Sequence, residues 1–289
     1  MKLLRSYVVF LILLFVSAQV SAQFRYGYFS VGIAVGATNY LGDLDDDFTP
    51  KFSRPGVAIV GNYKFHPHMQ ARLQFFHGWA SASDSKNKPG TGRFERNLHF
   101  RTPIREASFV LVYDFIATKR KYKYRPKFNP YVFAGVGVFS FNPQAELNGN
   151  WIDLQPLGTE GQFLPDPDNL YPDPYNLTQV NFPMGGGLRI MLARNWDLEI
   201  EIGWRKLLTD YLDDVSGEYP DLDALRAQNP TAFLLSDRGR EFDPVMFPNG
   251  VSATTYGWIR GDKTQDDWYI FSNVKVTYIL DWVKCPSFR

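Results

Sequence analysis

Residues 268–282, WYIFSNVKVTYILDW, alternate apolar and polar side chains over an unusual length. The even positions are apolar except Ser272, and Trp268 and Trp282 mark the two ends of that face. A strand of a soluble protein has about 5–6 residues. A tilted strand that crosses a bilayer needs about 9–11, with aromatic side chains at both interfaces. The stretch therefore predicts a transmembrane strand, with a long bent strand of a soluble sandwich as the alternative.

The N-terminus has the features of a secretory signal peptide. Lys2 and Arg5 precede an apolar run over residues 7–16, and Val20, Ser21 and Ala22 supply small residues at the cleavage position. We expect residues 1–22 to be removed and residues 23–289 to form one outer-membrane β-barrel. No later stretch has the roughly 18 consecutive apolar residues of a transmembrane helix.

Composition narrows the classes of function. The formal net charge of the chain is +1, and loss of Lys2 and Arg5 would leave +1 − 2 = −1. A nucleic-acid-binding protein normally carries a basic excess, so we expect no nucleic-acid partner. The single cysteine, Cys285, cannot form an internal disulfide and would be free or paired between chains.

Seven further segments show the same period of two, at residues 28–41, 56–65, 69–79, 105–116, 130–141, 182–192 and 197–207. In the first of them Phe29, Val31 and Ile33 share one face and small side chains the other. In segment 130–141 the shared face consists of Tyr131, Phe133, Phe139 and Phe141.

The connections alternate strictly in length. Those over residues 42–54, 80–97, 142–178 and 209–265 are long, and the others are short turns. Outer-membrane barrels show this alternation because periplasmic turns are short and extracellular loops are long. The sequence thus predicts an all-β fold, a closed antiparallel transmembrane β-barrel of about eight strands with long extracellular loops, located in the cell outer membrane among its lipids.

The polar faces of these strands would point into the barrel. They carry charges of both signs, at Arg72, Glu106, Asp114, Arg189, Glu199, Glu201, Arg205, Lys275 and Asp281. A small barrel has an interior that side chains can fill, and charges buried there need partners. We interpret this set as a salt-bridged plug; a polar pore or a proton-handling site is the alternative.

Catalytic and cofactor sites are not expected. Two histidines, His77 and His99, would lie near the outer rim of the barrel. Residues with nucleophilic or acidic side chains lie nearby in sequence: Ser81, Ser83, Asp84 and Ser85. The spacing of these residues along the chain does not by itself indicate the catalytic site of a hydrolase. The glycines at 185–187 lie within a strand, where a phosphate-binding loop does not fit. We therefore expect no enzyme activity, no cofactor, no metal ion and no small-molecule substrate, with a lipid-modifying or proteolytic rim enzyme as the least favoured alternative.

Two features of the sequence are candidates for binding a partner. The turn over residues 119–127 is densely basic, through Lys119, Arg120, Lys121, Lys123, Arg125 and Lys127. It would face the periplasm, either as a solvated turn near acidic headgroups or as a docking site for an acidic protein. The tail that contains Cys285 is the second feature.

Four strings give the chain a family resemblance: NYLGDL at 39–44, FNP at 141–143, DLQPLGTEG at 153–161 and TDYLDDVS at 209–216. The chain resembles the PorG-like outer-membrane barrels of Bacteroidetes, which are related to small OmpA-like barrels. The resemblance implies a component of the type IX secretion system that anchors or organises the secretion complex and contacts periplasmic ring proteins. A small channel or an adhesin of unassigned role is the alternative.

Overall fold

A computed structural model describes residues 27–45, 50–86, 92–118, 121–165, 168, 170–239 and 257–280 of the chain. The expected signal peptide, Asp281 and Cys285 lie outside these residues. Eight long strands dominate the described part: β1 (Tyr28–Leu41), β2 (Arg54–Lys64), β3 (Met69–Ser83), β4 (His99–Asp114), β5 (Phe128–Phe141), β8 (Thr178–Met191), β9 (Trp196–Leu207) and β10 (Trp268–Ile279).

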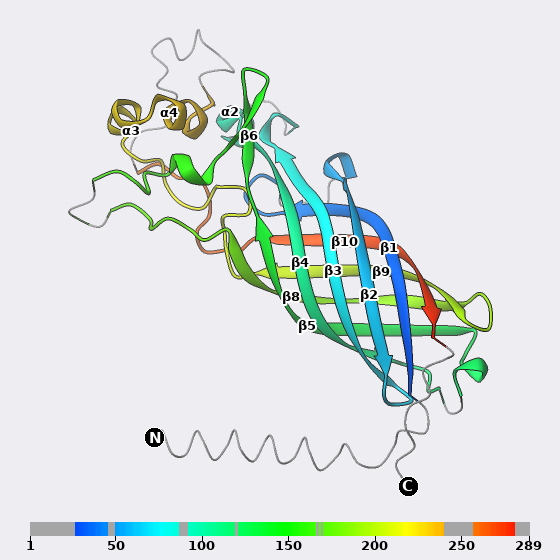
Figure 1. Cartoon of the computed structure of the whole chain (residues 1–289). Helices are drawn as coiled ribbons and strands as arrows, with labels where there is room; N and C mark the ends of the chain where they lie inside the picture. The colour runs from blue at the N-terminus through cyan, green and yellow to red at the C-terminus, as the bar shows by residue number, and fades with distance from the viewer. Residues whose placement is uncertain are drawn as a thin grey trace, which may run out of the picture.

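These strands close into a cylinder (Figure 1). Each strand pairs antiparallel with its neighbour in sequence, and the ring is completed by the pairing of β1 with β10. The closed antiparallel barrel of eight strands is therefore confirmed. Closure satisfies the backbone hydrogen bonds of every strand from within the protein, which a bilayer interior requires.

The outer surface of the barrel is apolar across its middle. Outward-facing side chains remain uncovered by protein, as shown by Ile33, which is 62% exposed, and Ile59, which is 63% exposed. Aromatic pairs mark the end with the short turns, where the rings of Phe29 and Tyr63 lie 4.4 Å apart. Exposure of such a continuous apolar band to water would cost much free energy. Lipid acyl chains must therefore cover the band, and the barrel spans a membrane.

Strand β5 differs from the simple alternation. Its aromatic face, with Tyr131, Phe133 and Phe139, points into the barrel, and Val132 and Val138 face outward at 44% and 50% exposure. Both faces of this strand are apolar, so hydrophobicity alone cannot decide which one faces lipid. The inward rings are explained by their contacts with arginines of the lumen.

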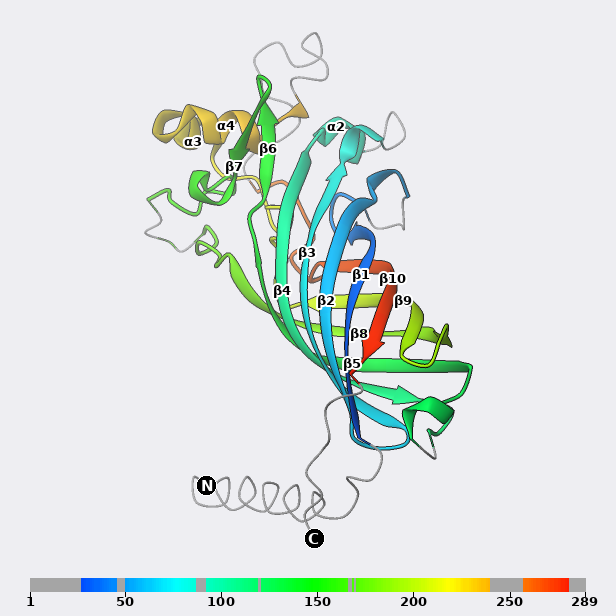
Figure 2. The same cartoon turned by 45° about the vertical axis from the view of Figure 1, so that its right-hand side comes forward.

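The long loops contain structure of their own at one end of the barrel, here called the long-loop end (Figure 2). This structure comprises β6 (Gln144–Leu147), β7 (Asn150–Asp153), α2 (Gly92–Arg96), α3 (Leu222–Gln228), α4 (Pro230–Ser236) and the single turns η1 (Pro50–Phe52), η2 (Asp84–Lys86) and η4 (Gln155–Leu157). At the opposite end, here called the short-turn end, the described residues include the single turn η3 (Tyr122–Tyr124). Among the described residues, no helix combines the length and the hydrophobicity needed to cross a membrane.

The loop around Pro230 contains two short helices, α3 and α4. Pro230 occupies the first turn of α4, where its missing N–H has no intrahelical partner to lose. Asn229 separates the helices, donates its backbone N–H to Leu225 at the end of α3, and accepts from Thr231 and Ala232 at the start of α4. Pro230 therefore marks the start of α4.

Candidate functional site: an ion-paired lumen beneath a loop cap

The inward-facing charges of the barrel are almost completely buried. Arg72, Glu199, Glu201 and Lys275 are each 1% exposed or less. They come from β3, β9 and β10, and alternation along each strand directs them inward because neighbouring residues face opposite sides. Eight of the nine residues predicted for the lumen lie in the interior; Asp281 lies outside the described residues.

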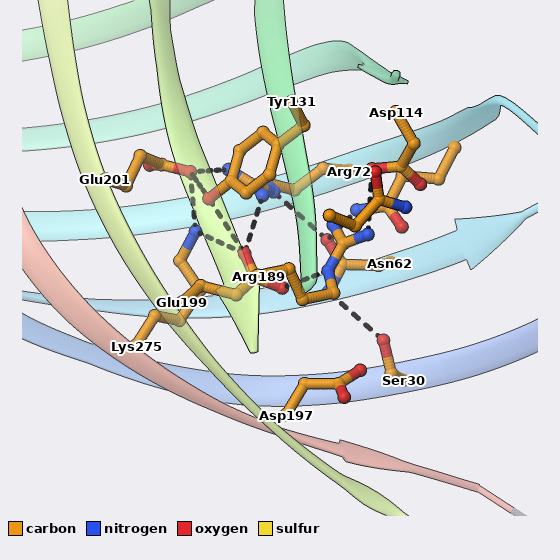
Figure 3. Close-up of polar contacts among 12 residues, drawn as sticks. Ser30, Asn62, Arg72, Asp114, Tyr131, Arg189, Asp197, Glu199, Glu201 and Lys275 are labelled. Carbon is orange, nitrogen blue, oxygen red and sulfur yellow. Dashed lines mark hydrogen bonds and ion pairs between the residues drawn. The ribbon is translucent and has the colours of Figure 1, made fainter. Parts of the chain in front are cut away.

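Two glutamates organise the central lumen network, which we define as Lys64, Arg72, Asp114, Tyr131, Arg189, Glu199, Glu201 and Lys275 (Figure 3). Arg72 pairs with Glu201 at 2.5 Å and with Glu199 at 3.1 Å across the barrel. Lys275 lies 2.9 Å from the same Glu201 oxygen, and Tyr131 donates its hydroxyl to both glutamates at 3.0 and 2.8 Å. Each carboxylate thus has several partners, which offsets the cost of its burial.

Asp114 extends this network toward the short-turn end. Arg189 joins Glu199 at 3.0 Å to Asp114 at 2.8 Å, and Lys64 pairs with the second oxygen of Asp114. Sequence analysis missed Lys64, although its even spacing from Asn62 on β2 was a sufficient signal for an inward side chain.

Gly187 provides the space for Tyr131. A Cβ at Gly187 would lie 2.6 Å from the Tyr131 hydroxyl and 2.6 Å from the backbone oxygen of Ile200. A Cβ at Gly185 would likewise lie 2.8 Å from the ring of Phe133, so these two glycines allow close packing inside the barrel.

A second buried pair lies nearer the long-loop end. Glu106 accepts from Asn181 at 2.7 Å, from Ser108 at 2.7 Å and from the hydroxyl of Tyr269. Arg205 lies 3.6 Å from Glu106, and its guanidinium group faces the rings of Phe76, Tyr269 and Phe271 at 5.5 to 6.0 Å. These cation–π contacts offset part of the cost of burying the Arg205 guanidinium group, as hydrogen bonds do for the other buried arginines.

The basic turn at the short-turn end divides into two parts. Lys121, Lys123 and Lys127 are exposed. Arg125, predicted to bind a partner, is 5% exposed: it pairs with Asp197 at 2.7 Å and donates to the backbone oxygens of Tyr122, Ala193, Arg194 and Trp196. Its donors are used within the chain, so Arg125 does not belong to the accessible surface. Lys119, Arg120 and Cys285 lie outside the described residues.

The two histidines predicted near the outer rim, His77 and His99, have different surroundings. Among the described residues, Nδ1 of His77 has no hydrogen-bond partner. His99 accepts a hydrogen bond from the backbone N–H of Glu146 at 3.0 Å. Nowhere in the described ranges do three potential metal ligands gather.

The long loops cover the open end of the barrel through buried carboxylates. We call this region the loop cap and define it by Tyr40, Glu160, Asp213, Asp214, Arg260 and Asp267. The hydroxyl of Tyr40 lies 2.5 Å from Asp213 and 2.8 Å from Asp267. Burial raises the pKa of Asp213 and the pKa of Asp267 well above the usual value, and each is raised further by a neighbouring aspartate.

Glu160 joins two separate loops within the cap. Its Oε1 accepts from Arg260 at 2.8 Å and from the backbone N–H of Ser216 at 2.9 Å. Asp214 accepts from Thr159 and Tyr175 at 2.5 Å each, and burial raises its pKa to about 6. The loops at 142–178 and 209–265 therefore form one connected structure.

Closure, an apolar outer band and an ion-paired interior together define this molecule as a transmembrane β-barrel of eight strands. A family model described as a domain of unknown function (DUF6089) matches residues 5–153. The chain belongs to this family.

Comparison with solved structures gives similar barrels. They include Neisserial surface protein A (9% identity, 86% of this chain, 96% of that chain, TM-score 0.41) and Ail of Yersinia pestis in complex with the heparin analogue sucrose octasulfate (8%, 88%, 99%, 0.41). OprG of Pseudomonas aeruginosa matches at 10% identity over 89% of this chain and 98% of that chain, with a TM-score of 0.38. A search of curated proteins finds no match.

Replacement of Arg72 by methionine tests the central lumen network. Arg72→Met leaves Glu201 with Lys275 as its remaining charged partner, and breaking a buried pair costs about 3–5 kcal/mol. We expect a loss of that size in urea unfolding followed by tryptophan fluorescence in detergent. The double variant Arg72→Met/Glu201→Gln should recover part of it, and the exposed control Lys51→Met should change little. A loss below about 1 kcal/mol for Arg72→Met, as for a surface pair, would contradict the assignment.

The loop cap should weaken as the pH rises. A carboxyl group whose folded pKa is raised contributes stability that is complete below the unfolded value and is lost as pH rises through the folded value. Burial raises the pKa of Asp210 to about 9 and that of Asp213 in the same direction. The melting temperature in detergent should therefore fall between about pH 4 and pH 9. Asp213→Asn, which keeps a neutral group, should reduce this slope; an unchanged slope would argue against Asp213 as a source.

Proposed function

We propose that this protein is a closed, non-enzymatic outer-membrane barrel that anchors a protein assembly. The observation that carries the proposal is the occupied lumen. Arg72 pairs with Glu201 across the barrel, and Arg189 and Lys275 pair with Glu199 and Glu201 from the strands on either side of β9. A solute that passed through the barrel would have to break several buried ion pairs. We therefore assign the function to the surfaces of the barrel and not to its lumen. An outer-membrane location agrees with the apolar band and with the signal peptide expected at 1–22.

The short-turn end offers the surface for a partner. Lys121, Lys123 and Lys127 are exposed beside Arg125, which fixes the turn to the neighbouring β8–β9 turn through the carbonyls of Ala193 and Arg194. Charges displayed on a fixed base attract and orient an acidic partner, because complementary potentials steer encounter and fix register. In an exported barrel with this loop arrangement, the short-turn end faces the periplasm.

The assembly we propose is the type IX secretion complex, with a periplasmic ring protein as the partner. This finer proposal rests on the resemblance to PorG-like barrels. Two of the strings that carry the resemblance, at 153–161 and 209–216, supply Glu160 and Asp213 to the loop cap. The resemblance therefore includes residues that shape the long-loop end.

Neutralisation of the exposed lysines tests the anchoring proposal. The variant Lys121→Gln/Lys123→Gln/Lys127→Gln should reduce co-purification of periplasmic proteins from gently solubilised outer membranes about tenfold or more. A matched control, Lys51→Gln/Lys86→Gln/Lys263→Gln, removes the same charge from the long-loop end, where all three side chains are exposed. Equal recovery with both variants would contradict the proposal, and identification of the co-purified proteins tests the secretion assignment separately.

An adhesin or channel of unassigned role is the second candidate, favoured by the ordered loop cap at the long-loop end. Planar-bilayer recording separates the channel from the anchor. The ion-paired lumen predicts no steady current from wild-type protein at moderate voltage, with an inserted open porin as the positive control. A steady, ion-selective current would overturn the closed-lumen proposal.

A further inference from the structure

An arginine on the outer wall of the barrel, Arg105, is partly exposed to the surroundings. This residue of β4 faces outward, and no described residue gives its side chain a hydrogen bond or an ion pair. A cation on the lipid-facing wall costs about 2–4 kcal/mol at the bilayer midplane and close to 0–1 near the interface. Arg105 is therefore expected at the edge of the apolar band, and its unused donors are available to the membrane or to a ligand.

Other polar groups lie beside Arg105 in register. Arg105 pairs with His77 of β3 on one side and with Ser140 of β5 on the other, and Ser140 pairs with Thr178 of β8. These four outward residues form one row across four adjacent strands, here called the polar row. Nδ1 of His77 is a buried nitrogen without a hydrogen-bond partner, and the His77 ring contacts Trp79 edge-on at 4.6 Å.

An apolar hollow adjoins the polar row on its membrane side. The next outward residues toward the short-turn end are Phe75, Ala107 and Val138, which also pair in register. Ala107 is the small member, and Phe75 and Val138 stand on either side of it at 55% and 50% exposure. A depression with a volume of about 600 Å³ is lined by these residues and by the polar row. The depression is open rather than enclosed, so a molecule bound there would lie along the outer wall of the barrel.

We propose that this depression binds a membrane lipid with a phosphate headgroup, its phosphate on the polar row and one acyl chain over Ala107. The guanidinium group of Arg105 presents a planar pair of donors that match phosphate oxygens, and the hydroxyls of Ser140 and Thr178 add donors beside it. The hollow lies on the membrane side of these donors, in the order in which a lipid presents headgroup and chain. Free phosphate would satisfy the donors alone and leave the hollow unused.

Lipid binding can be tested by native mass spectrometry of the full mature chain released from detergent. The probe is phosphatidic acid; diacylglycerol with the same chains lacks the phosphate, and inorganic phosphate lacks the chains. We expect one retained phosphatidic acid per protein, at least tenfold weaker retention of diacylglycerol, and no competition from inorganic phosphate.

Two variants separate the two parts of the site. Arg105→Gln removes the charge, and Ala107→Phe fills the hollow while leaving the charge in place; each should weaken retention about tenfold. Both positions face outward, so the barrel should still form, which heat-modifiable migration on gels checks. Lys206→Gln is the matched control, because Lys206 is another cation near the long-loop end, on β9, where it lies over the ring of Trp268.

Three outcomes would overturn the proposal. Equal retention of phosphatidic acid by wild type and Arg105→Gln would leave only nonspecific lipid on the apolar band. Displacement of the lipid by inorganic phosphate would indicate a general anion site. A dimer mass in wild type that Ala107→Phe abolishes would assign the hollow to a second copy of the chain.

Discussion

The structure depends on the burial of opposite charges in a cylinder whose wall has no free edge. A bilayer offers no hydrogen bonds to the backbone, so the pairing of β1 with β10 is obligatory once the other strands have formed. Closure then encloses Glu199 and Glu201, and the low polarity of the interior would make them costly without Arg72 and Lys275. The wall and its contents therefore require each other: the ion pairs need enclosure, and the enclosed space needs polar groups that satisfy one another.

Much of this fold could be predicted from the sequence because lipid enforces a strict alternation. The predicted first strand, 28–41, agrees with β1 at both ends, since every outward position from Phe29 to Val35 is apolar and every inward one small or polar. Strand β5 shows the limit. On this strand Tyr131 and Phe133 face Arg72 inside the barrel, and valines face lipid outside. Both faces are apolar, so hydrophobicity cannot show which face points into the barrel.

The candidate site was predictable in membership but not in pairing. The inward position of Arg189 follows from its own strand, whereas its contacts with Asp114 and Glu199 depend on how far the strands are staggered around the ring. Alternation within one strand contains no information about that stagger. The hairpin of β6 and β7 was not predicted for a different reason. Its turn, Asn148-Gly149, has positive φ at both residues and is a strong local signal, but it lies inside residues 142–178, which were predicted only as a long connection.

Arg125 has a mechanical consequence for the short-turn end. One side chain holds the β4–β5 connection and the β8–β9 turn to each other through a carboxylate and several main-chain oxygens. These two neighbouring connections are thereby held to each other at the short-turn end of the barrel. A molecule that docks there meets a surface that folding has already ordered. Binding therefore costs less conformational entropy, and more of the free energy of the contacts contributes to affinity.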